Sequence, residues 1–321
     1  MDQHVWDQKV HLNPLVPKPN TIKEPYTLSG ASVAAHRTGF KIGSFRLDAG
    51  HSVFDSWAIL LISHGHADHT FSICSFLLAD HEGEPRPIYT PEKTILPLAD
   101  GACSILRANY GHDFSNAEIC RRRKVQFMGA SPGQTLQHDD YIISVYRMDH
   151  HVPTVGYGIS KRVKGINPAI GVLLQKYPTK TMQIMTYLKG RNIIPELDLE
   201  DLVLLQELVG QPTEVYNTYP QFCYLTDTSI KGITDNLVQI LPFPIKIVEC
   251  TFYDNEDMEH AINKYHMHWN FLEPIMLQDQ ASLYVLIHYS KKYLDLPTIM
   301  SILERQHDKD WTLPSNILIW Q

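Results

Sequence analysis

Four side chains that commonly bind metal ions, His64, His66, Asp68 and His69, occur within six residues. They follow the apolar run 58–62, which is typical of a buried strand that ends in a loop. In an extended segment His64 and His66 point to the same side, so one ion could bind both while Asp68 and His69 serve a second. Histidine with carboxylate and no cysteine suits Zn²⁺ or Mn²⁺ in an open site. The alternative, a polar turn with a chance run of histidines, is disfavoured because such side chains repel one another without a metal. The cluster therefore predicts half of a two-metal hydrolytic centre.

Three further candidate ligands lie shortly after apolar stretches that read as strands: His150 after 141–146, Asp227 after 222–225, and His288 after 283–287. Strand ends are where a rigid sheet gathers side chains that are distant in sequence. Taken singly, His288 is more simply a buried core histidine and Asp227 a turn residue. Their order and spacing as a set favour a shared metal site.

These motifs resemble those of the metallo-β-lactamase fold, and further segments are similar to its RNase Z branch. The segment 149–157 (DHHVPTVGY) is similar to one whose metal-binding histidine lies six residues before a Gly-Tyr pair. That spacing selects His150 over His151. The segment 224–228 (YLTDT) resembles a strand-end G-D-T sequence whose aspartate bridges both metals, with Thr226 in place of the glycine.

The remaining matches lie in the last quarter of the chain. The segment 286–293 (LIHYSKKY) resembles the L-T-H-x-S-x-R-Y sequence that carries the last histidine ligand, with Lys292 in place of arginine. The segment 248–252 (VECTF) resembles the H-E-A-T-F strand of the RNase Z branch. His266 aligns with the histidine of the H-x-T motif that follows in that branch, and His268 occupies the position of its threonine.

The resemblance implies an α/β fold: an αββα sandwich of the metallo-β-lactamase type, in which helices flank two mixed β-sheets. It also implies two divalent metal ions, zinc by preference and manganese as the alternative. The ligands would be His64, His66 and His150 for one ion, Asp68, His69 and His288 for the other, and Asp227 between them.

The same resemblance suggests catalytic roles beside the metals. Asp68 is placed to accept a proton from the attacking water. His266 could act as a general acid toward the leaving ribose oxygen, aligned by Glu249. His268 is a further catalytic candidate from the same motif. Asp48 lies at a strand end like that of the family's L-D-x-G segment and is a candidate to orient the ligands.

Three functions are compatible with these motifs. The first is a metal-dependent endoribonuclease that resembles RNase Z and hydrolyses a phosphodiester of precursor tRNA or other RNA. The second is a small-molecule hydrolase of the same fold, such as a β-lactamase, thioesterase or cyclic phosphodiesterase, because a fold does not determine a function. The third is a non-catalytic RNA-binding protein, which seven intact ligand positions argue against. RNase Z proteins commonly pair, so the resemblance also suggests a homodimer.

Composition is that of a globular protein, with 44% hydrophobic and 20% charged residues. We predict a proline-containing irregular arm at 1–25 and a single domain at 26–321, with an insertion at about 160–215. Five cysteines without regular spacing, and no signal-peptide pattern, favour the cytoplasm or another reducing compartment, with the nucleus or an organelle as alternatives. No apolar run approaches the ~20 residues of a membrane span, so no membrane role is expected.

The charge distribution is uneven. The net charge is −7, yet residues 121–191 hold twelve Lys and Arg against three Asp, a net charge of +9. Residues 192–260 carry −11. The basic segment could contact RNA phosphates, or it could pair with the acidic one. The candidate RNA contacts in its densest parts are Arg121, Arg122, Arg123, Lys124, Lys161, Arg162 and Lys164.

Local patterns predict the elements that must position these residues. Short strands are expected at 40–42 and 44–48 around Gly43, and helices at 72–79, at 92–109 with a fault at Pro97, and at 196–210. The substrate-gripping arm of RNase Z proteins would fall at 161–220, but its Gly-Pro-rich tip is not recognisable there. Either residues 161–191 replace that arm, or RNA is held differently.

Overall fold

The computed structural model describes residues 8–13, 26–51, 57–78, 83–111, 113–190, 194–293 and 295–320. The chain divides into two compact units, which we describe separately. The main unit comprises residues 1–160 and 220–321, and the inserted unit comprises residues 161–219.

The first sheet of the main unit contains seven strands in sequence order. They are β1 (Gln8–Leu12), β2 (Tyr26–Val33), β3 (Arg37–Ile42), β4 (Phe45–Leu47), β5 (Ile59–Leu61), β6 (Arg86–Pro91) and β7 (Val125–Ala130). Neighbours are antiparallel from β1 to β4 and parallel from β4 to β7. The two short strands predicted around Gly43 are confirmed as β3 and β4, and Gly43 has a φ of 57° that suits a glycine turn. The predicted irregular arm is wrong for Gln8–Leu12, because β1 pairs with β2 there; residues 1–7 and 14–25 of that arm lie outside the described residues.

The second sheet also has seven strands, in the order β14-β13-β12-β11-β10-β9-β8. They are β8 (Thr135–His138), β9 (Tyr141–Arg147), β10 (Val155–Ile166), β11 (Glu214–Leu225), β12 (Ile245–Glu249), β13 (Leu283–Ile287) and β14 (Ile317–Ile319). Strands β8 and β9 are antiparallel, whereas β11 to β14 are parallel. Parallel central strands are buried on both faces, which explains why 222–225 and 283–287 are continuous apolar runs.

The two sheets pack face to face around an apolar core. Tyr26 and Phe45 of the first sheet contact Phe222 of the second edge to face, with ring centroids 5.6 and 5.7 Å apart. Phe40 similarly meets Trp320 at 5.3 Å. Such aromatic pairs each contribute about 0.5–1.5 kcal/mol beyond the area that they bury.

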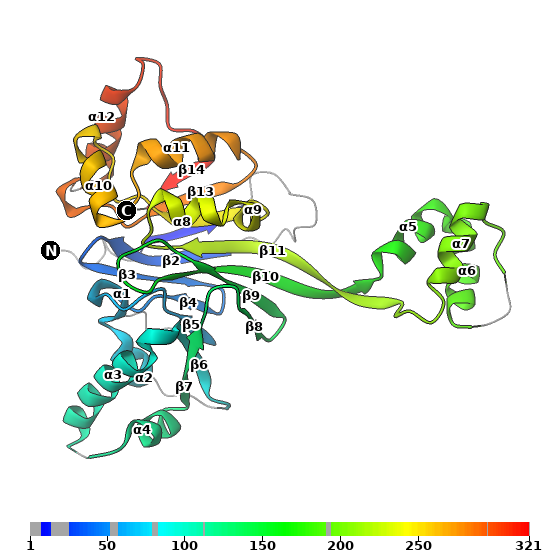
Figure 1. The fold of residues 1–321 in the computed structure, drawn as a ribbon, viewed down its shortest axis with the longest axis horizontal. Coiled ribbons are helices and arrows are strands. Elements are labelled where there is room, and N and C mark those ends of the chain that lie inside the picture. Colours follow the sequence, from blue (N-terminus) through cyan, green and yellow to red (C-terminus); the bar gives the residue numbers. More distant parts are fainter. Residues whose placement is uncertain are drawn as a thin grey trace. The chain divides into compact units, whose positions relative to one another are not determined.

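Helices cover the outer face of each sheet (Figure 1). On the first sheet these are α1 (Ala67–Thr70), α2 (Ile73–Leu78), α3 (Ile95–Tyr110) and α4 (Asn116–Arg122). On the second they are α8 (Ile230–Asp235), α9 (Leu237–Ile240), α10 (Met258–Lys264), α11 (Trp269–Gln278) and α12 (Leu296–Gln306). One apolar cluster joins helices to each sheet, and a third lies between the sheets. The predicted αββα sandwich is thereby confirmed.

The predicted helices differ from the structure at their ends. The helix expected at 72–79 is α2, which ends at Leu78, and Ala79 lies outside the described residues. The one expected at 92–109 is a short 3₁₀ turn, Glu92–Thr94, followed by α3. Pro97 does not break it, because it occupies the first turn of α3, where a backbone N–H has no partner within the helix.

The inserted unit is a small helical bundle between β10 and β11. Helices α5 (Pro168–Lys176), α6 (Thr181–Leu188) and α7 (Leu199–Glu207) enclose a core of six buried apolar residues. The helix expected at 196–210 is the shorter α7, which begins directly after Asp198. No helix among the described residues of the whole chain has the length and apolar character needed to cross a membrane.

A buried ion pair holds α11 to the second sheet. Lys246 Nζ of β12 lies 2.7 Å from Asp279 Oδ2, and their side chains are only 1% and 9% exposed. Removing one partner of such a pair leaves a buried charge and costs about 3–5 kcal/mol. We therefore expect Lys246→Met to lower the free energy of unfolding by that amount in urea denaturation. Lys231→Met, which breaks the exposed pair with Asp235, should cost less than about 1 kcal/mol, and equal losses would contradict this account.

Candidate metal centre

The seven predicted ligands lie together at the ends of strands from both sheets. The loop after β5 supplies His64, His66, Asp68 and His69, and the ends of β9, β11 and β13 supply the other three. The ligand atoms form two groups, each within 4.8 Å: His64, His66, His150 and Asp227 in one, and Asp68, His69 and His288 in the other. The structure thus brings together side chains that are more than 200 positions apart in sequence.

Asp227 faces both groups. Its Oδ1 is 3.4 Å from Nε2 of His69 and 3.4 Å from Nε2 of His288. Its Oδ2 is 3.7 Å from Nε2 of His64 in the other group. A carboxylate with one oxygen toward each group is what a bridging ligand requires.

Four of the histidines are oriented by hydrogen bonds from Nδ1. Because a carboxylate or carbonyl can only accept, His69 donates to Asp48 at 2.7 Å and His150 donates to the Tyr265 carbonyl at 3.2 Å. The hydroxyl of Ser63 donates to Asp48 and so accepts from His64, while that of Thr251 donates to Glu249 and so accepts from His288. Each ring is thereby held with its Nε2 atom facing the cluster, as in metal-binding histidines.

The donor set fits a divalent cation. Nε2 of His150 is buried and has no hydrogen-bond partner, which is costly for a polar atom unless something else binds it. Nitrogen and carboxylate donors without a thiolate match zinc or manganese.

Burial and charge shift the pKa values of the cluster in opposite directions. Burial lowers the pKa of His150 to about 4, which keeps its imidazole neutral. Burial would also lower the pKa of His69, but the carboxylates of Asp227 and Asp48 raise it to about 9. Burial would raise the pKa of Asp227, yet the facing His288 and His69 hold it well below its usual range. The Asp227 carboxylate is thus ionised at neutral pH, the state that binds cations.

Asp48 organises the loop that carries the first four ligands. It has a positive φ of 58° and accepts hydrogen bonds from the Ser63 backbone and from the Tyr224 hydroxyl, in addition to His69. Close by, a Cβ on Gly50 would lie 1.6 Å from the Asp68 carbonyl oxygen, so only glycine permits this approach of the loop.

Replacing Asp48 should weaken metal binding without removing a ligand. Asp48→Asn cannot accept from every one of its donors, so His69 would lose its orientation. Loss of such outer partners costs about 10–100-fold in metal affinity. Competition with a chromophoric chelator would measure this, with Asp235→Asn on the exposed face of α8 as the control. Unchanged affinity in Asp48→Asn would refute the role.

Glu249 and His266 form a pair beside the cluster. Nδ1 of His266 is 3.1 Å from both carboxylate oxygens of Glu249, which is fully buried. Burial would lower the pKa of His266, but the Glu249 carboxylate raises it to about 9, so the ring is protonated at neutral pH. A ligand atom of His266 also lies within 4.8 Å of those of Asp227 and His288. The ring can therefore either donate a proton into the centre or bind a cation itself.

His268 does not join the cluster. Its Nδ1 accepts from the Asn270 backbone at the start of α11, and its Nε2 donates to the Asp254 carbonyl at 2.8 Å. Both ring nitrogens are thus occupied in capping a helix, and we leave His268 out of the proposed catalytic residues.

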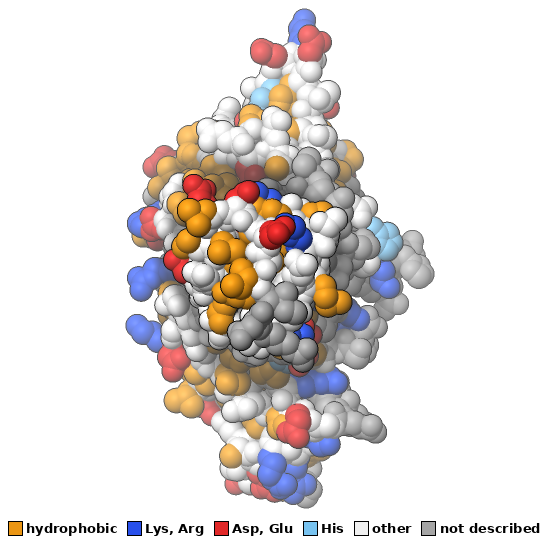
Figure 2. All heavy atoms as spheres, turned by 90° about the vertical axis from the view of Figure 1, so that its right-hand side faces the viewer, with side chains coloured by type: hydrophobic (Ala, Val, Ile, Leu, Met, Phe, Trp, Pro, Cys, Tyr) orange, Lys and Arg blue, Asp and Glu red, His pale blue; other side chains and the backbone are white. Residues whose placement is uncertain are grey.

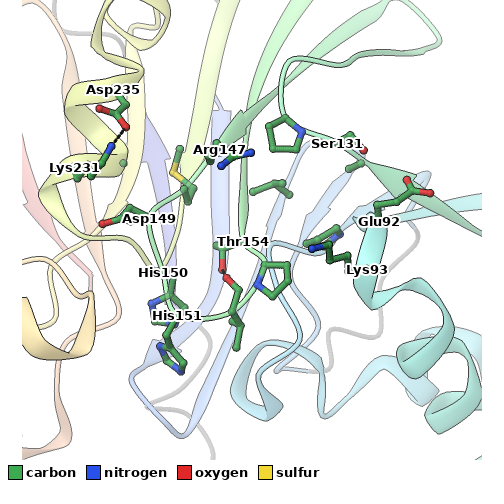
Figure 3. Close-up of a pocket in the computed structure, with 18 residues that line it drawn as sticks. Glu92, Lys93, Ser131, Arg147, Asp149, His150, His151, Thr154, Lys231 and Asp235 are labelled. Carbon is green, nitrogen blue, oxygen red and sulfur yellow. Dashed lines mark hydrogen bonds and ion pairs between the residues drawn. The ribbon is translucent and has the colours of Figure 1, made fainter.

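A cleft of about 710 Å³ adjoins the cluster (Figure 3). His150 and His151 both line it, together with Arg147 and Lys93. The His151 ring lies 4.2 Å from that of His150 and 4.8 Å from that of His66 between centroids. The sequence motifs gave His151 no role, although its position in a double histidine was the available signal.

The predicted RNA contacts are largely engaged within the protein. Arg122 pairs with Glu118, and Arg123 lies over the Tyr110 ring. In the inserted unit Lys164 pairs with Glu214 at 2.7 Å, and Arg162 lies over the Tyr216 ring. Arg121 is exposed on α4, Lys124 is half-buried after it, and Lys161 is half-buried in β10.

Basic and acidic segments of the inserted unit neutralise each other. Lys176 lies 2.5 Å from Asp201 and 3.2 Å from Asp198, and Lys180 lies 3.9 Å from Glu196. Figure 2 shows acidic and basic side chains next to one another among hydrophobic ones on this unit. The sequence left two alternatives, contact with RNA or pairing between the basic and acidic segments. Within the inserted unit, the structure shows pairing.

Comparison with known proteins shows which fold this chain shares. No family model matches the chain. The metallo-β-lactamase fold protein YhfI from Bacillus subtilis aligns with a TM-score of 0.51 at 14% identity, over 91% of this chain and 93% of its own. The long form RNase Z from yeast has a TM-score of 0.51 at 15% identity, over 98% of this chain and 41% of its own. The chain therefore has the metallo-β-lactamase fold, as the sequence motifs predicted.

A sequence relative lies in the expected branch. A ribonuclease Z from Gloeothece citriformis (strain PCC 7424) is 25% identical over an alignment of 253 residues, and the match covers 73% of this chain and 68% of that protein. The resemblance to RNase Z proteins that the motifs indicated is confirmed by this match.

Proposed function

We propose that this protein is a metal-dependent endoribonuclease that hydrolyses a phosphodiester bond of RNA, with precursor tRNA as the expected substrate. The observation that carries the proposal is the position of the Glu249–His266 pair against a cluster of seven candidate ligands. A metal centre alone would serve many hydrolases, but a protonated histidine beside it suits a poor leaving group such as a ribose oxygen.

In this proposal His64, His66 and His150 hold one cation, Asp68, His69 and His288 hold another, and Asp227 contributes to both. Two divalent cations there, zinc by preference or manganese, would supply Lewis acidity toward a phosphoryl oxygen and lower the pKa of water. Asp68 is kept ionised, with a pKa of about 2, because its hydrogen bond to His288 and the charge of His69 outweigh burial.

The chain's own groups then move the protons. Asp68 accepts a proton from the attacking water, since its Oδ2 points to the centre, 3.3 Å from Nε2 of His288. His266 donates a proton to the leaving 3′ oxygen, and Glu249 holds the ring and stabilises its positive charge. Asp48 and Thr251 keep two of the imidazoles in the required orientation.

A small-molecule hydrolase is the second candidate. The cleft beside His150 has a volume of about 710 Å³, within the range of about 300–1,000 Å³ that small ligands occupy. Its formal charges cancel, because the lining contains three cationic residues (Lys93, Arg147 and Lys231) and three anionic ones (Glu92, Asp149 and Asp235), so the cleft does not by itself select a polyanion.

One panel of substrates separates these functions. The purified protein is incubated with a 3′-extended tRNA, an unstructured RNA, a phosphodiester ester and a chromogenic lactam, each with and without chelator. We expect chelator-sensitive cleavage of the tRNA at a single position, and its loss in His66→Ala. Cleavage confined to the lactam or the small ester would replace the first candidate by the second. Tight RNA binding with neither cleavage nor bound metal would support a non-catalytic protein.

We further propose a reducing compartment, such as the cytoplasm, and pairing into a homodimer. The five cysteines form no disulfide, and three are buried and two half-buried, which suits a reducing environment. The dimer rests on the resemblance to RNase Z proteins.

A further inference from the structure

A hollow of about 170 Å³ lies beside His266 at the candidate centre. It is lined by Asp149, Ser229, Ile230, Ile262, Tyr265, His266 and Phe271. His266 is therefore a wall of the hollow and also the proposed proton donor. Whatever occupies this hollow lies next to the leaving group.

The hollow is small and largely apolar. Its volume is below the range of about 300–1,000 Å³ typical of whole small-molecule ligands, so it admits one ring system rather than a complete nucleotide. Ile262 and Tyr265 are 57% and 43% exposed, although both are large and hydrophobic. Among the described residues, no hydrogen bond or ring contact engages the Tyr265 side chain. An aromatic surface is thus presented to solvent beside the reacting groups.

The backbone conformation of Tyr265 favours glycine, so a tyrosine at this position calls for an explanation. Tyr265 ends helix α10 with φ 56° and ψ 41°, a left-handed conformation that glycine adopts most easily. Its carbonyl accepts the hydrogen bond that orients His150. Glycine would provide that carbonyl and the helix end with less strain, so neither role explains a tyrosine. Non-glycine residues in this conformation concentrate at functional sites.

We propose that the Tyr265 ring, with Ile262 and Phe271, is the stacking platform for one nucleobase of the substrate. This inference rests on the proposed function and deepens it. Because His266 serves the leaving 3′ oxygen, the base belongs to the nucleotide on the 5′ side of the scissile phosphate. Unpaired bases of RNA stack on exposed aromatic side chains in this way, with little dependence on sequence. Tyr265 is therefore a residue that positions the cleaved nucleotide.

The test measures binding without catalysis. A 3′-extended tRNA carries 2-aminopurine directly 5′ of the cleavage position and is titrated with the protein in the presence of chelator. Stacking on Tyr265 should quench its fluorescence. Tyr265→Phe should behave as wild type, whereas Tyr265→Gly should lose the quenching and bind about 5- to 100-fold more weakly. An abasic site at the same position should weaken wild type by a similar factor and leave Tyr265→Gly unchanged.

Further controls make each outcome interpretable. Val238→Ala removes part of an exposed apolar side chain on α9 and should change nothing. Thermal melting of Tyr265→Gly confirms folding, and the abasic substrate tests wild type without any variant. The inference is overturned if wild type neither quenches the probe nor discriminates the abasic RNA. Cleavage by the metal-loaded wild type is scored separately, so an active enzyme that shows neither quenching nor discrimination of the abasic RNA refutes the platform and leaves the proposed function standing.

Discussion

Replacing Asp227 by asparagine should abolish both metal binding and hydrolysis. Asp227 has one oxygen facing each group of candidate ligands. Its neutral amide has the same shape but cannot balance the charge of two cations. Because loss of an outer partner alone costs about 10–100-fold in affinity, loss of this ligand should exceed 100-fold. Metal content by mass spectrometry and RNA cleavage are the two measurements.

The control for this variant is Asp149→Asn, a half-buried carboxylate near His150 that belongs to neither group. It should retain both metals. The assignment fails if Asp227→Asn keeps a full complement of tightly bound metal. If Asp227→Asn retains its metal but loses activity, Asp227 acts in catalysis and is not required for metal binding.

Replacing His266 by alanine should lower turnover by about 10²–10⁴-fold while the metals stay bound, because a general acid contributes about that much. The expected signature is a lower kcat with little change in KM. A substrate with a good leaving group, such as a nitrophenyl ester of a nucleotide, should be affected much less, since it needs no proton.

This variant also decides between the two roles that the geometry gives His266. If His266→Ala loses a metal ion, the ring is a ligand in the group with Asp227 and His288. His268→Ala is the matched control. Its ring caps α11 away from the cluster, so it should lower thermal stability and leave turnover per folded molecule unchanged.

The sequence was most informative where chemistry restricts residue types. Candidate ligands could be named because histidine and aspartate after apolar runs form an ordered set, and the strands before them follow from the same runs. The sandwich followed from the resemblance that this set carried. Helix ends were less predictable. A proline such as Pro97 predicts a break within a helix, but Pro97 lies in the first turn of α3, where a proline is tolerated.

Other features depend on contacts that no local pattern reveals. His268 was a catalytic candidate because it occupies the threonine position of the H-x-T motif. In the structure its ring instead hydrogen-bonds the backbone at the start of α11. The roles of Ser63, Thr251 and Tyr265 emerge only when strands distant in sequence are side by side. The basic residues of 161–191 could be counted, but not the acidic partners that neutralise them.

The division of the ligands between the two sheets has a consequence for how the protein matures. During synthesis the loop after β5 leaves the ribosome long before β11 and β13. Its histidines are therefore exposed before Asp227 and His288 have been synthesised. A cation captured then would meet only half of its final donors. Tight capture would become possible when both layers have closed on each other, and from then on a bound ion would stabilise the assembled layers by mass action. Metal supply would thus set not only the activity of this protein but also how long each molecule survives in the cell.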